Sequence, residues 1–145
     1  VVNGKHIAVA TSHFESLDNS QRRKEQLAIA FKALEAYDDA LLMGDFNFDS
    51  TWNNEEKVIP PEYRDVWIDI KKINTWTMPQ TDRYSAWRPD RILIKSKNWK
   101  AVAVDRVGDF SIPPYEHQQL EEIVVDGRVR TPSDHMGLAC KIQQM

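Results

Sequence analysis

Hydrophobic positions near the start of the chain change from a strand-like period to a helix-like period and back. The apolar, partly β-branched run at residues 6–12 predicts a buried strand. Over residues 20–37 the apolar positions recur every three or four residues, which predicts an amphipathic helix with Asn19 or Ser20 able to cap it. The apolar run at residues 40–43 predicts a second buried strand. Strand, helix and strand in this order are typical of layered α/β folds.

The rest of the chain has a more strand-like pattern. Pro60 and Pro61 precede residues 62–72, whose pattern predicts a second, short helix. Four further segments predict strands and are divided by proline-containing loops: residues 74–77, 91–95, 101–107 and 138–142. We therefore expect a mixed α/β (α+β) fold without repeats, linkers or low-complexity segments.

The composition fits one globular domain over residues 1–145. Hydrophobic residues make up 41% of the chain and charged residues 28%, and a chain of this length buries roughly 70% of the surface that it exposes when unfolded. The single cysteine, Cys140, lies in an apolar strand pattern. It excludes an internal disulfide and favours a reducing compartment, so we expect an intracellular location, nuclear or cytoplasmic. We also expect no membrane span and no signal peptide.

The charge gives no global argument for a nucleic-acid partner, because the net charge is −3. A polyanionic substrate would have to be met locally. One basic band could meet a phosphate backbone, but a solvated face is the more common meaning of such a pattern. The band consists of Lys95, Lys97 and Lys100 with Arg22, Arg23 and Lys24.

Polar side chains follow the second predicted strand directly. In the stretch LLMGDFNFDS, Asp45 and Asn47 lie two positions apart, so on an extended chain they point to the same side while Phe46 points to the core. Gly44 allows close approach of a ligand or backbone. Carboxylate and amide oxygens are ligands that Mg²⁺ prefers. An Asx turn that merely leaves the strand explains the same residues about equally well.

Three other polar clusters lie at predicted strand ends or in loops. They are His13 with Glu15 and Ser16, then Asp90, then Asp134 with His135. An adjacent Asp and His at a strand start can serve a phosphoryl site, with the Asp toward a cation and the His toward phosphate. A second carboxylate, such as Asp90, can orient the ring and support its charge.

These motifs occur in an order that resembles the endonuclease/exonuclease/phosphatase superfamily, and most of all its tyrosyl-DNA phosphodiesterase 2 branch. They are SHFES at residues 12–16, GDFN at 44–47, TW at 75–76, RPDRILI at 88–94 and SDHMGL at 133–138. The resemblance covers nearly the whole chain and corresponds to the C-terminal half of the family domain. It implies half of a four-layered, two-sheet β-sandwich flanked by helices, with the active site at one end where loops of both sheets meet.

The resemblance also implies catalytic roles. Asp45 would orient or deprotonate the attacking water, and Asn47 would hold that water or the phosphate. His135 would stabilise charge that develops on phosphorus, and Asp90 would support the histidine. Such chemistry depends on positioning and electrostatics at a metal, without a covalent intermediate.

Binding roles follow from the same resemblance. Asp134 would act with Asp45 at the metal, which we expect to be Mg²⁺, with Mn²⁺ as an alternative. His13, counted with the catalytic residues, and Ser16 would bind phosphate oxygens. Trp76 would line the substrate groove, although packing in the core is the alternative role for this side chain.

The resemblance is incomplete at the metal. The family's main metal ligand is a glutamate in the first half of the domain, and this sequence begins after that point, while Glu15 lies in a different element. We expect a Mg²⁺-dependent phosphodiesterase that acts on DNA ends such as a 5′-tyrosyl phosphodiester. The alternatives are another superfamily activity (abasic-site nuclease, sphingomyelinase or inositol polyphosphate phosphatase) and a non-catalytic fragment. The expected partners are DNA or another phosphodiester, and either the first half of the domain or a second copy of the chain.

Overall fold

The computed structural model describes residues 1–108, 124–125, 128–129 and 133–145. Within these residues lie three helices, α1 (Ser20–Leu34), α2 (Asn53–Glu56) and α3 (Val66–Lys71). The strands are β1 (Ala8–His13), β2 (Ala40–Asp45), β3 (Arg64–Asp65), β4 (Asp90–Lys95), β5 (Trp99–Val107), β6 (Val124–Val125), β7 (Arg128–Val129) and β8 (Gly137–Gln144). None of the helices described has both the length and the apolar run needed to span a bilayer.

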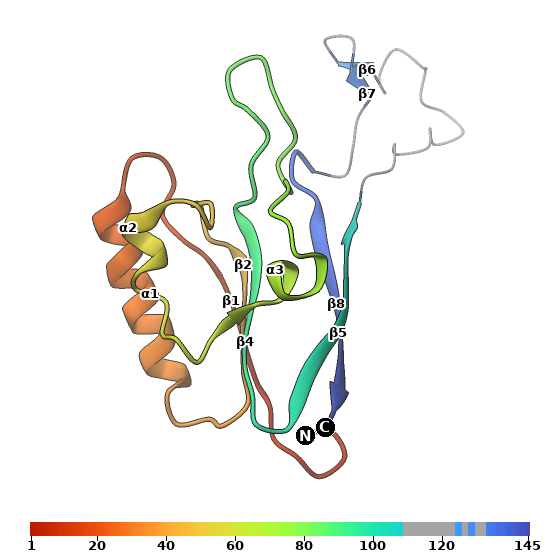
Figure 1. Cartoon of the computed structure of the whole chain (residues 1–145). Coiled ribbons are helices and arrows are strands. Elements are labelled where there is room, and N and C mark those ends of the chain that lie inside the picture. Colours follow the sequence, from red (N-terminus) through yellow and green to blue (C-terminus); the bar gives the residue numbers. More distant parts are fainter. Residues whose placement is uncertain (109–123, 126–127, 130–132) are drawn as a thin grey trace, which may run out of the picture.

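The main sheet has four strands in the order β1-β2-β4-β3. β1 and β2 are parallel and are joined through α1, whereas β4 runs antiparallel to both β2 and β3. β5 pairs with β8, and β6 pairs with β7, in separate antiparallel sheets. Figure 1 shows α1 and α2 on one side of the main sheet, and α3 with the β5–β8 pair on the other. This arrangement confirms the expected α/β class with two sheets and flanking helices.

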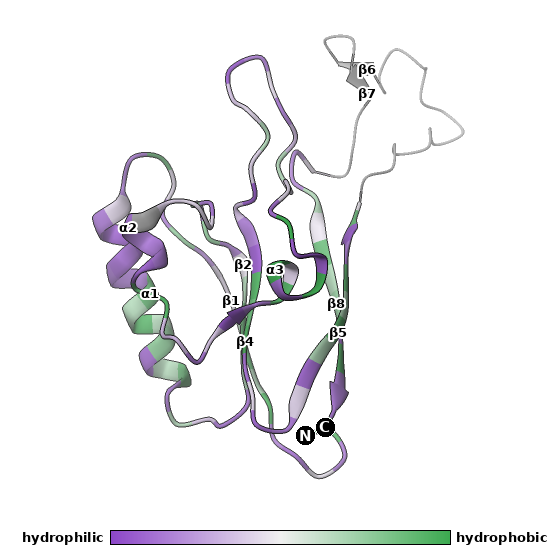
Figure 2. Cartoon of the chain, in the orientation of Figure 1, coloured by the Kyte–Doolittle hydropathy of each residue, from purple (hydrophilic) through white to green (hydrophobic). Residues whose placement is uncertain are grey.

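Both faces of the main sheet are covered, which explains why β2 is a continuous apolar run. Ala40 and Leu42 pack in one hydrophobic cluster with Phe31 of α1. Leu41, which points the other way, packs in a second cluster with Val104 of β5. Successive side chains on a strand point to opposite faces, so a strand between two layers needs apolar residues at every position. Figure 2 shows hydrophobic residues along the strands that lie between these layers.

A buried ionic network fixes the start of β4 to its neighbours. Arg91 donates from Nε to Asp65 Oδ2 at 2.9 Å and makes two bonds to Glu56 at 2.7 and 3.1 Å. Arg88, which is fully buried, donates to the same Asp65 oxygen at 2.9 Å. Burial would raise the pKa of Asp65, but the two arginines outweigh it and lower the pKa below its usual value. The segment that carries Asp90 is therefore held by charge-assisted bonds on both sides.

Most of the predicted elements are confirmed, two predictions are wrong, and the capping prediction for α1 is confirmed only in its position. The second helix does not start at residue 62, because Arg64 and Asp65 pair with β4, so α3 begins at Val66. Residues 74–77 form no strand; instead the backbone N–H of Thr77 donates to the carbonyl of Trp87. Asn19 occupies the N-cap position of α1 without a capping bond from its side chain, which donates to a loop carbonyl.

Four cations of the predicted basic band contact other parts of the chain, and one of them, Arg22, lies 3.6 Å from the carboxylate of Glu15. Arg23 is buried and pairs with Glu55 at 2.6 Å. Lys97 pairs with Asp38 at 2.9 Å, and Lys95 Nζ donates to the last carbonyls of α1. These contacts hold α1, α2 and the turn after β4. They favour a structural role for the basic band over a role in binding a phosphate backbone.

Candidate active site

Three polar residues of the main sheet lie in one row at the ends of neighbouring strands. The register pairs His13 of β1 with Asp45 of β2, and Asp45 with Asp90 of β4. Paired residues on adjacent strands have their side chains within reach of each other. His13 Nε2 lies 3.5 Å from Asp45 Oδ2, although the histidine side chain is 72% exposed. Strand pairing thus brings together residues from three separate motifs.

The segment before β8 adds a histidine to this row. His135 Nδ1 lies 2.9 Å from Asp90 Oδ2 and 3.8 Å from Asp45 Oδ2. The side chains of Asp45, Asp90 and His135 are 16%, 18% and 23% exposed, so all three are shielded but reachable from solvent. The backbone N–H of His135 donates to Ser133 Oγ at 3.0 Å, which fixes the turn that presents the ring. We call Asp45, Asp90 and His135 the acidic triad.

Thr77 holds Asp90 and the His135 segment together. Its hydroxyl donates to Asp90 Oδ2 at 2.7 Å and accepts from the backbone N–H of Asp90 at 3.2 Å. Its carbonyl accepts from the N–H of Met136 at 2.7 Å. The threonine is 0% exposed, so the bonds are sheltered from competition by water. One buried residue therefore sets the distance between the carboxylate and the histidine.

The electrostatics of the acidic triad favour a bound cation. Burial raises the pKa of Asp90 above its usual value, and the Asp45 carboxylate adds to the rise. Hydrogen bonds and charge from Thr77 and His135 oppose this rise without cancelling it. Two carboxylates that face one another at a partly buried site repel, and a cation near them relieves the repulsion.

Asn47 adopts a left-handed backbone conformation, with φ of 52°, directly after the strand end. Its backbone N–H donates to Asp45 Oδ1 at 2.8 Å, which is the Asx turn considered from the sequence. Its side-chain Nδ2 donates to the carbonyl of Phe14 at 2.9 Å. The turn therefore locks one face of the amide to the end of β1 and orients the Asp45 carboxylate. The Asx turn is confirmed, and the expectation that Asp45 and Asn47 point to the same side of an extended chain is wrong, because Asn47 leaves the extended conformation.

The other predicted site residues lie outside the acidic triad. Asp134 and Ser16 are exposed, and Glu15 is half-buried with its carboxylate 3.6 Å from Arg22. Trp76 lies against Arg106, whose guanidinium carbon is 4.0 Å from the ring centroid. The group that can converge on one ion among the described residues thus contains Asp90 rather than Asp134.

The donor set of the acidic triad suits a divalent cation in part. One ligand atom from each member lies within 4.8 Å of the others. Carboxylate oxygens match hard cations such as Mg²⁺, but His135 is already bonded to Asp90, and Mg²⁺ prefers oxygen ligands. Asp45 is therefore the residue best placed to hold the metal, whereas Asp90 is hydrogen-bonded to His135 and orients its ring. A single carboxylate binds Mg²⁺ weakly, so further oxygen ligands are needed for tight binding.

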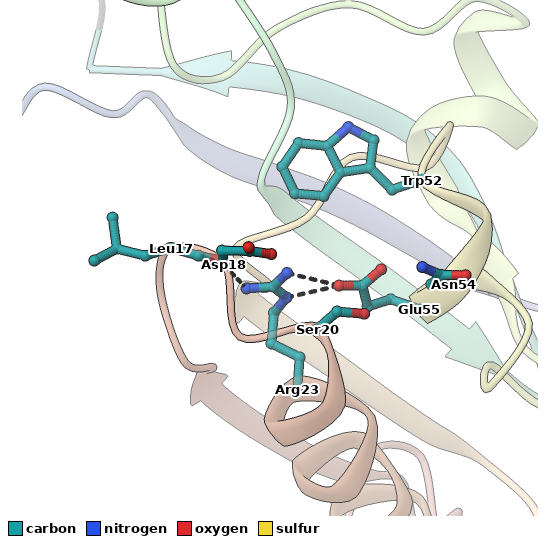
Figure 3. Close-up of a pocket in the computed structure, with 7 residues that line it drawn as sticks. All are labelled: Leu17, Asp18, Ser20, Arg23, Trp52, Asn54 and Glu55. Carbon is teal, nitrogen blue, oxygen red and sulfur yellow. Dashed lines mark hydrogen bonds and ion pairs between the residues drawn. The ribbon is translucent and has the colours of Figure 1, made fainter.

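A pocket of about 440 Å³ lies apart from the acidic triad, between the start of α1 and α2. Figure 3 shows the guanidinium of Arg23 facing the carboxylate of Glu55 there, with the indole of Trp52 above them. Arg23 also donates to the carbonyls of Glu15 and Leu17. Arg23 and Glu55 are thus bonded to each other and to loop carbonyls, which favours a structural role for this pair.

Sequence reasoning missed Thr77 and the stacking of Trp52 on Trp87. The indole rings of the two tryptophans have centroids 5.3 Å apart and planes 9° apart. Neither feature has a periodic signal, because both depend on loops that meet only in the folded chain. The turn around Ser133 did have a signal, since a serine two residues before a histidine can form such a turn.

Comparisons with known proteins agree with this geometry. The sequence profile described as "Endonuclease/Exonuclease/phosphatase family" matches residues 8–135. No curated protein matches the chain.

Among solved structures, a humanized zebrafish TDP2 (TM-score 0.67, 25% identity) is aligned over 92% of this chain and 53% of its own. Zebrafish TDP2 complexed with a single-strand DNA product has a TM-score of 0.65 at 26% identity, over 92% and 54% of the two chains. The human Nocturnin catalytic domain, at 14% identity and TM-score 0.59, shares the fold over 99% of this chain and 49% of its own. The chain thus spans about half the length of these solved proteins.

Proposed function

The chain belongs to the endonuclease/exonuclease/phosphatase family, and from this premise we propose that it carries the catalytic strand ends of a metal-dependent phosphodiesterase that acts on DNA ends. The observation that supports the proposal most is the acidic triad, in which Asp90 contacts His135 at 2.9 Å beside Asp45. The solved zebrafish TDP2 bound to a single-strand DNA product supports the choice of substrate.

The proposed reaction is the attack of water on a phosphodiester: a P–O bond to the water oxygen forms, the P–O bond to the leaving oxygen breaks, and that oxygen departs with the bonding electron pair and takes a proton from solvent. Asp45 orients the water and accepts its proton, while Asn47 helps to place the phosphate. His135 stabilises the negative charge that grows on the phosphoryl oxygens, and Asp90 holds the ring in the correct orientation. His13, at the exposed edge of the row, contacts a further phosphate oxygen. Asp45, with Asp134, would hold a Mg²⁺ ion, or Mn²⁺ as the alternative, and the ion would supply Lewis-acid stabilisation of the same charge.

The remaining oxygen ligands are expected from outside the residues described. The solved TDP2 chains are about twice as long as this one, so we propose that these 145 residues correspond to the C-terminal half of the family domain. Asp134, which adjoins His135 in the sequence and is exposed, is retained as the residue of this chain that would join Asp45 at the metal, although it lies outside the group that converges on one ion here. Ser16 and Trp76 are retained as candidate substrate contacts.

The test is hydrolysis of a 5′-modified DNA strand in Mg²⁺ by the full-length protein that contains this segment. Asp45→Ala and His135→Ala should each lower kcat by about 10²-fold or more, as expected for loss of a general base or charge-stabilising group. Asp38→Ala and His6→Ala, which change an exposed carboxylate and an exposed histidine elsewhere, are the matched controls. Turnover by Asp45→Ala within a few fold of its control would contradict the proposal and favour a non-catalytic role.

A further inference from the structure

β1 is an edge strand of the main sheet in the part of the chain that the structure describes, because the strand order begins with it. Toward β2, the N–H of Ala8 donates to the carbonyl of Asp39, and the N–H of Phe14 donates to that of Asp45. Alternate residues of a strand direct their N–H and C=O groups to opposite edges, so Val9 and its alternate neighbours direct theirs away from β2. Such a row of backbone groups is a template for a further strand.

The residues before β1 form a two-residue turn of the kind that joins hairpin strands. Asn3 and Gly4 both have positive φ, of 48° and 74°. Val2 and Lys5 exchange two backbone hydrogen bonds, at 2.9 and 3.0 Å. Positive φ at both central residues is the mark of a type I′ turn, whose twist matches that of antiparallel strands. Lys5 lies four positions before Val9, so the arm at Val2 is on the free edge of β1.

Both faces of this free edge expose apolar surface. On the face toward the β5–β8 pair, Val9 is 60% exposed, whereas Leu41, its partner on β2, is buried. On the face toward α1, a pocket of about 330 Å³ is lined in part by Ala10, Ile29 and Leu42. A strand that lies between two layers needs apolar residues at nearly every position. The partner that fits this edge is therefore an extended segment with an almost continuous apolar run.

The other edge of the main sheet is already covered. α3 follows β3 directly and contacts both β4 and β5, and Figure 1 shows it between the main sheet and β5. The main contacts of β1 are with β2 and α1, so no described element closes the sandwich on this side in the same way. Ile7, and Leu138 and Ile142 of β8, pack against the core there but are only partly buried. The described residues thus form a sandwich that is open along β1.

We propose that the free edge of β1 binds an antiparallel strand from the first half of the family domain, which continues the main sheet beyond β1. This inference rests on the proposed function, which supplies the other half, and adds the place and register of the contact. The pair of Val2 and Lys5 sets that register. The residue before Val1 then lies opposite Ile7, and the third residue before Val1 lies opposite Val9.

The turn favours this occupant over a second copy of the chain. A second copy would compete with the arm at Val1 and Val2, which already pairs at the start of the same edge. This chain covers 53% and 54% of the two zebrafish TDP2 chains, so those proteins have the length to supply the strand.

The test is a disulfide across the proposed strand pair in the full-length protein that contains this segment. Cys140 and any other native cysteine are replaced by alanine, and Val9→Cys is combined with a cysteine at the third residue before Val1. Opposed residues of an antiparallel pair have Cα atoms about 5.5 Å apart or closer, which a disulfide can bridge. The offset control combines Val9→Cys with a cysteine at the fourth residue before Val1, which points to the other face. Peptide mapping after mild oxidation should find at least about 10-fold more disulfide within one chain for the opposed pair than for the offset pair.

A second measurement tests the apolar cover over Val9. In the full-length protein, Val9→Asp should lower the urea midpoint of unfolding by about 0.5 M or more, because the added strand would bury the charge. Ile73→Asp is the control, since Ile73 lies after α3 and is 63% exposed, and it should shift the midpoint little.

Three results would overturn the inference: equal disulfide formation in the opposed and offset pairs, disulfides that join only two copies of the protein, and equal midpoints for Val9→Asp and Ile73→Asp. An opposed disulfide in a protein that hydrolyses no phosphodiester would support the strand and count against the catalytic proposal alone. Hydrolysis by a protein in which neither pair forms a disulfide would overturn the strand and leave the catalytic proposal in place.

Discussion

At the residue scale, Thr77 is the buried side chain that positions Asp90 against the segment of His135. We expect Thr77→Val, which keeps the shape but removes the hydroxyl, to leave Asp90 without its 2.7 Å donor. Loss of a buried bond to a charged group should lower the free energy of unfolding by about 1–3 kcal/mol. In the full-length protein kcat should fall by about 10-fold with little change in KM, because the defect lies in positioning and not in substrate binding.

Thr77→Ser is the matched control, since it restores the hydroxyl without the methyl group. A purely structural threonine would give the same kcat in the Val and Ser variants, and that result would contradict a positioning role. Denaturant unfolding of both variants separates the stability effect from the kinetic one.

The residues of the acidic triad differ in how far the sequence could predict them. Asp45 and Asp90 follow or open apolar runs, so strand periodicity alone placed both at strand ends. Only the family resemblance could predict their contact with His135, because 45 residues separate Asp90 from the histidine. Thr77 could not be predicted, because nothing in a single threonine shows which distant carboxylate it will meet.

At the element scale, the contact between β1 and β2 depends on Gly44. A Cβ atom there would lie 2.0 Å from the carbonyl oxygen of Ser12, and the φ of Gly44 is +130°. Gly44→Ala should therefore push β1 away from β2 and lower the free energy of unfolding by about 3 kcal/mol or more. It should also lower activity, because His13 and Asp45 sit in the same register.

Gly4→Ala provides the comparison, because Gly4 has φ of +74° but no atom within 4 Å of the added Cβ. That variant tests backbone strain alone and should cost about 1 kcal/mol. Equal unfolding midpoints for the two variants would show that the strands do not approach as closely as described.

Elements with a strong period were predictable, and those held by irregular contacts were not. The period of α1 and the apolar runs of β2 and β4 follow from burial on one or both faces. Residues 74–77 look strand-like, but the only bridge here is the isolated one between Met78 and Trp87, so the described residues form a loop and no strand. α2 spans only Asn53–Glu56, which is too short for any helical period to show.

At the scale of the whole molecule, acid stability should depend on Asp39, which ties the start of β2 to the turn after β4. Burial would raise the pKa of this carboxyl, but hydrogen bonds from Ser96, Asn98 and Lys97 lower it to about 2. The usual value is 3.8, so the stabilisation is present above about pH 4 and is lost as the pH falls toward 2. Asp39→Asn should cost about 1–3 kcal/mol at pH 7.

The measurement is the denaturant midpoint of both proteins between pH 7 and pH 2. Their difference should shrink below about pH 4, because protonated Asp39 loses the same charge-assisted bonds in the parent. A difference that stays constant down to pH 2 would contradict the hydrogen-bond arrangement around this carboxyl. Asp38→Asn, at an exposed neighbouring carboxylate, is the control and should change stability little.

In the proposed site, Asp90 and His135 act as one unit beside Asp45. The most direct test is a double-mutant cycle on kcat/KM in the full-length protein, with Asp90→Asn, His135→Ala and the pair. Residues that act as a unit lose their effect together. The kcat/KM of each single variant should therefore fall by about 10²-fold or more, and the kcat/KM of the double variant should lie within a few fold of that of the less active single variant. Losses that multiply in the double variant, or an Asp90→Asn enzyme that keeps nearly full activity, would show that the two residues act separately.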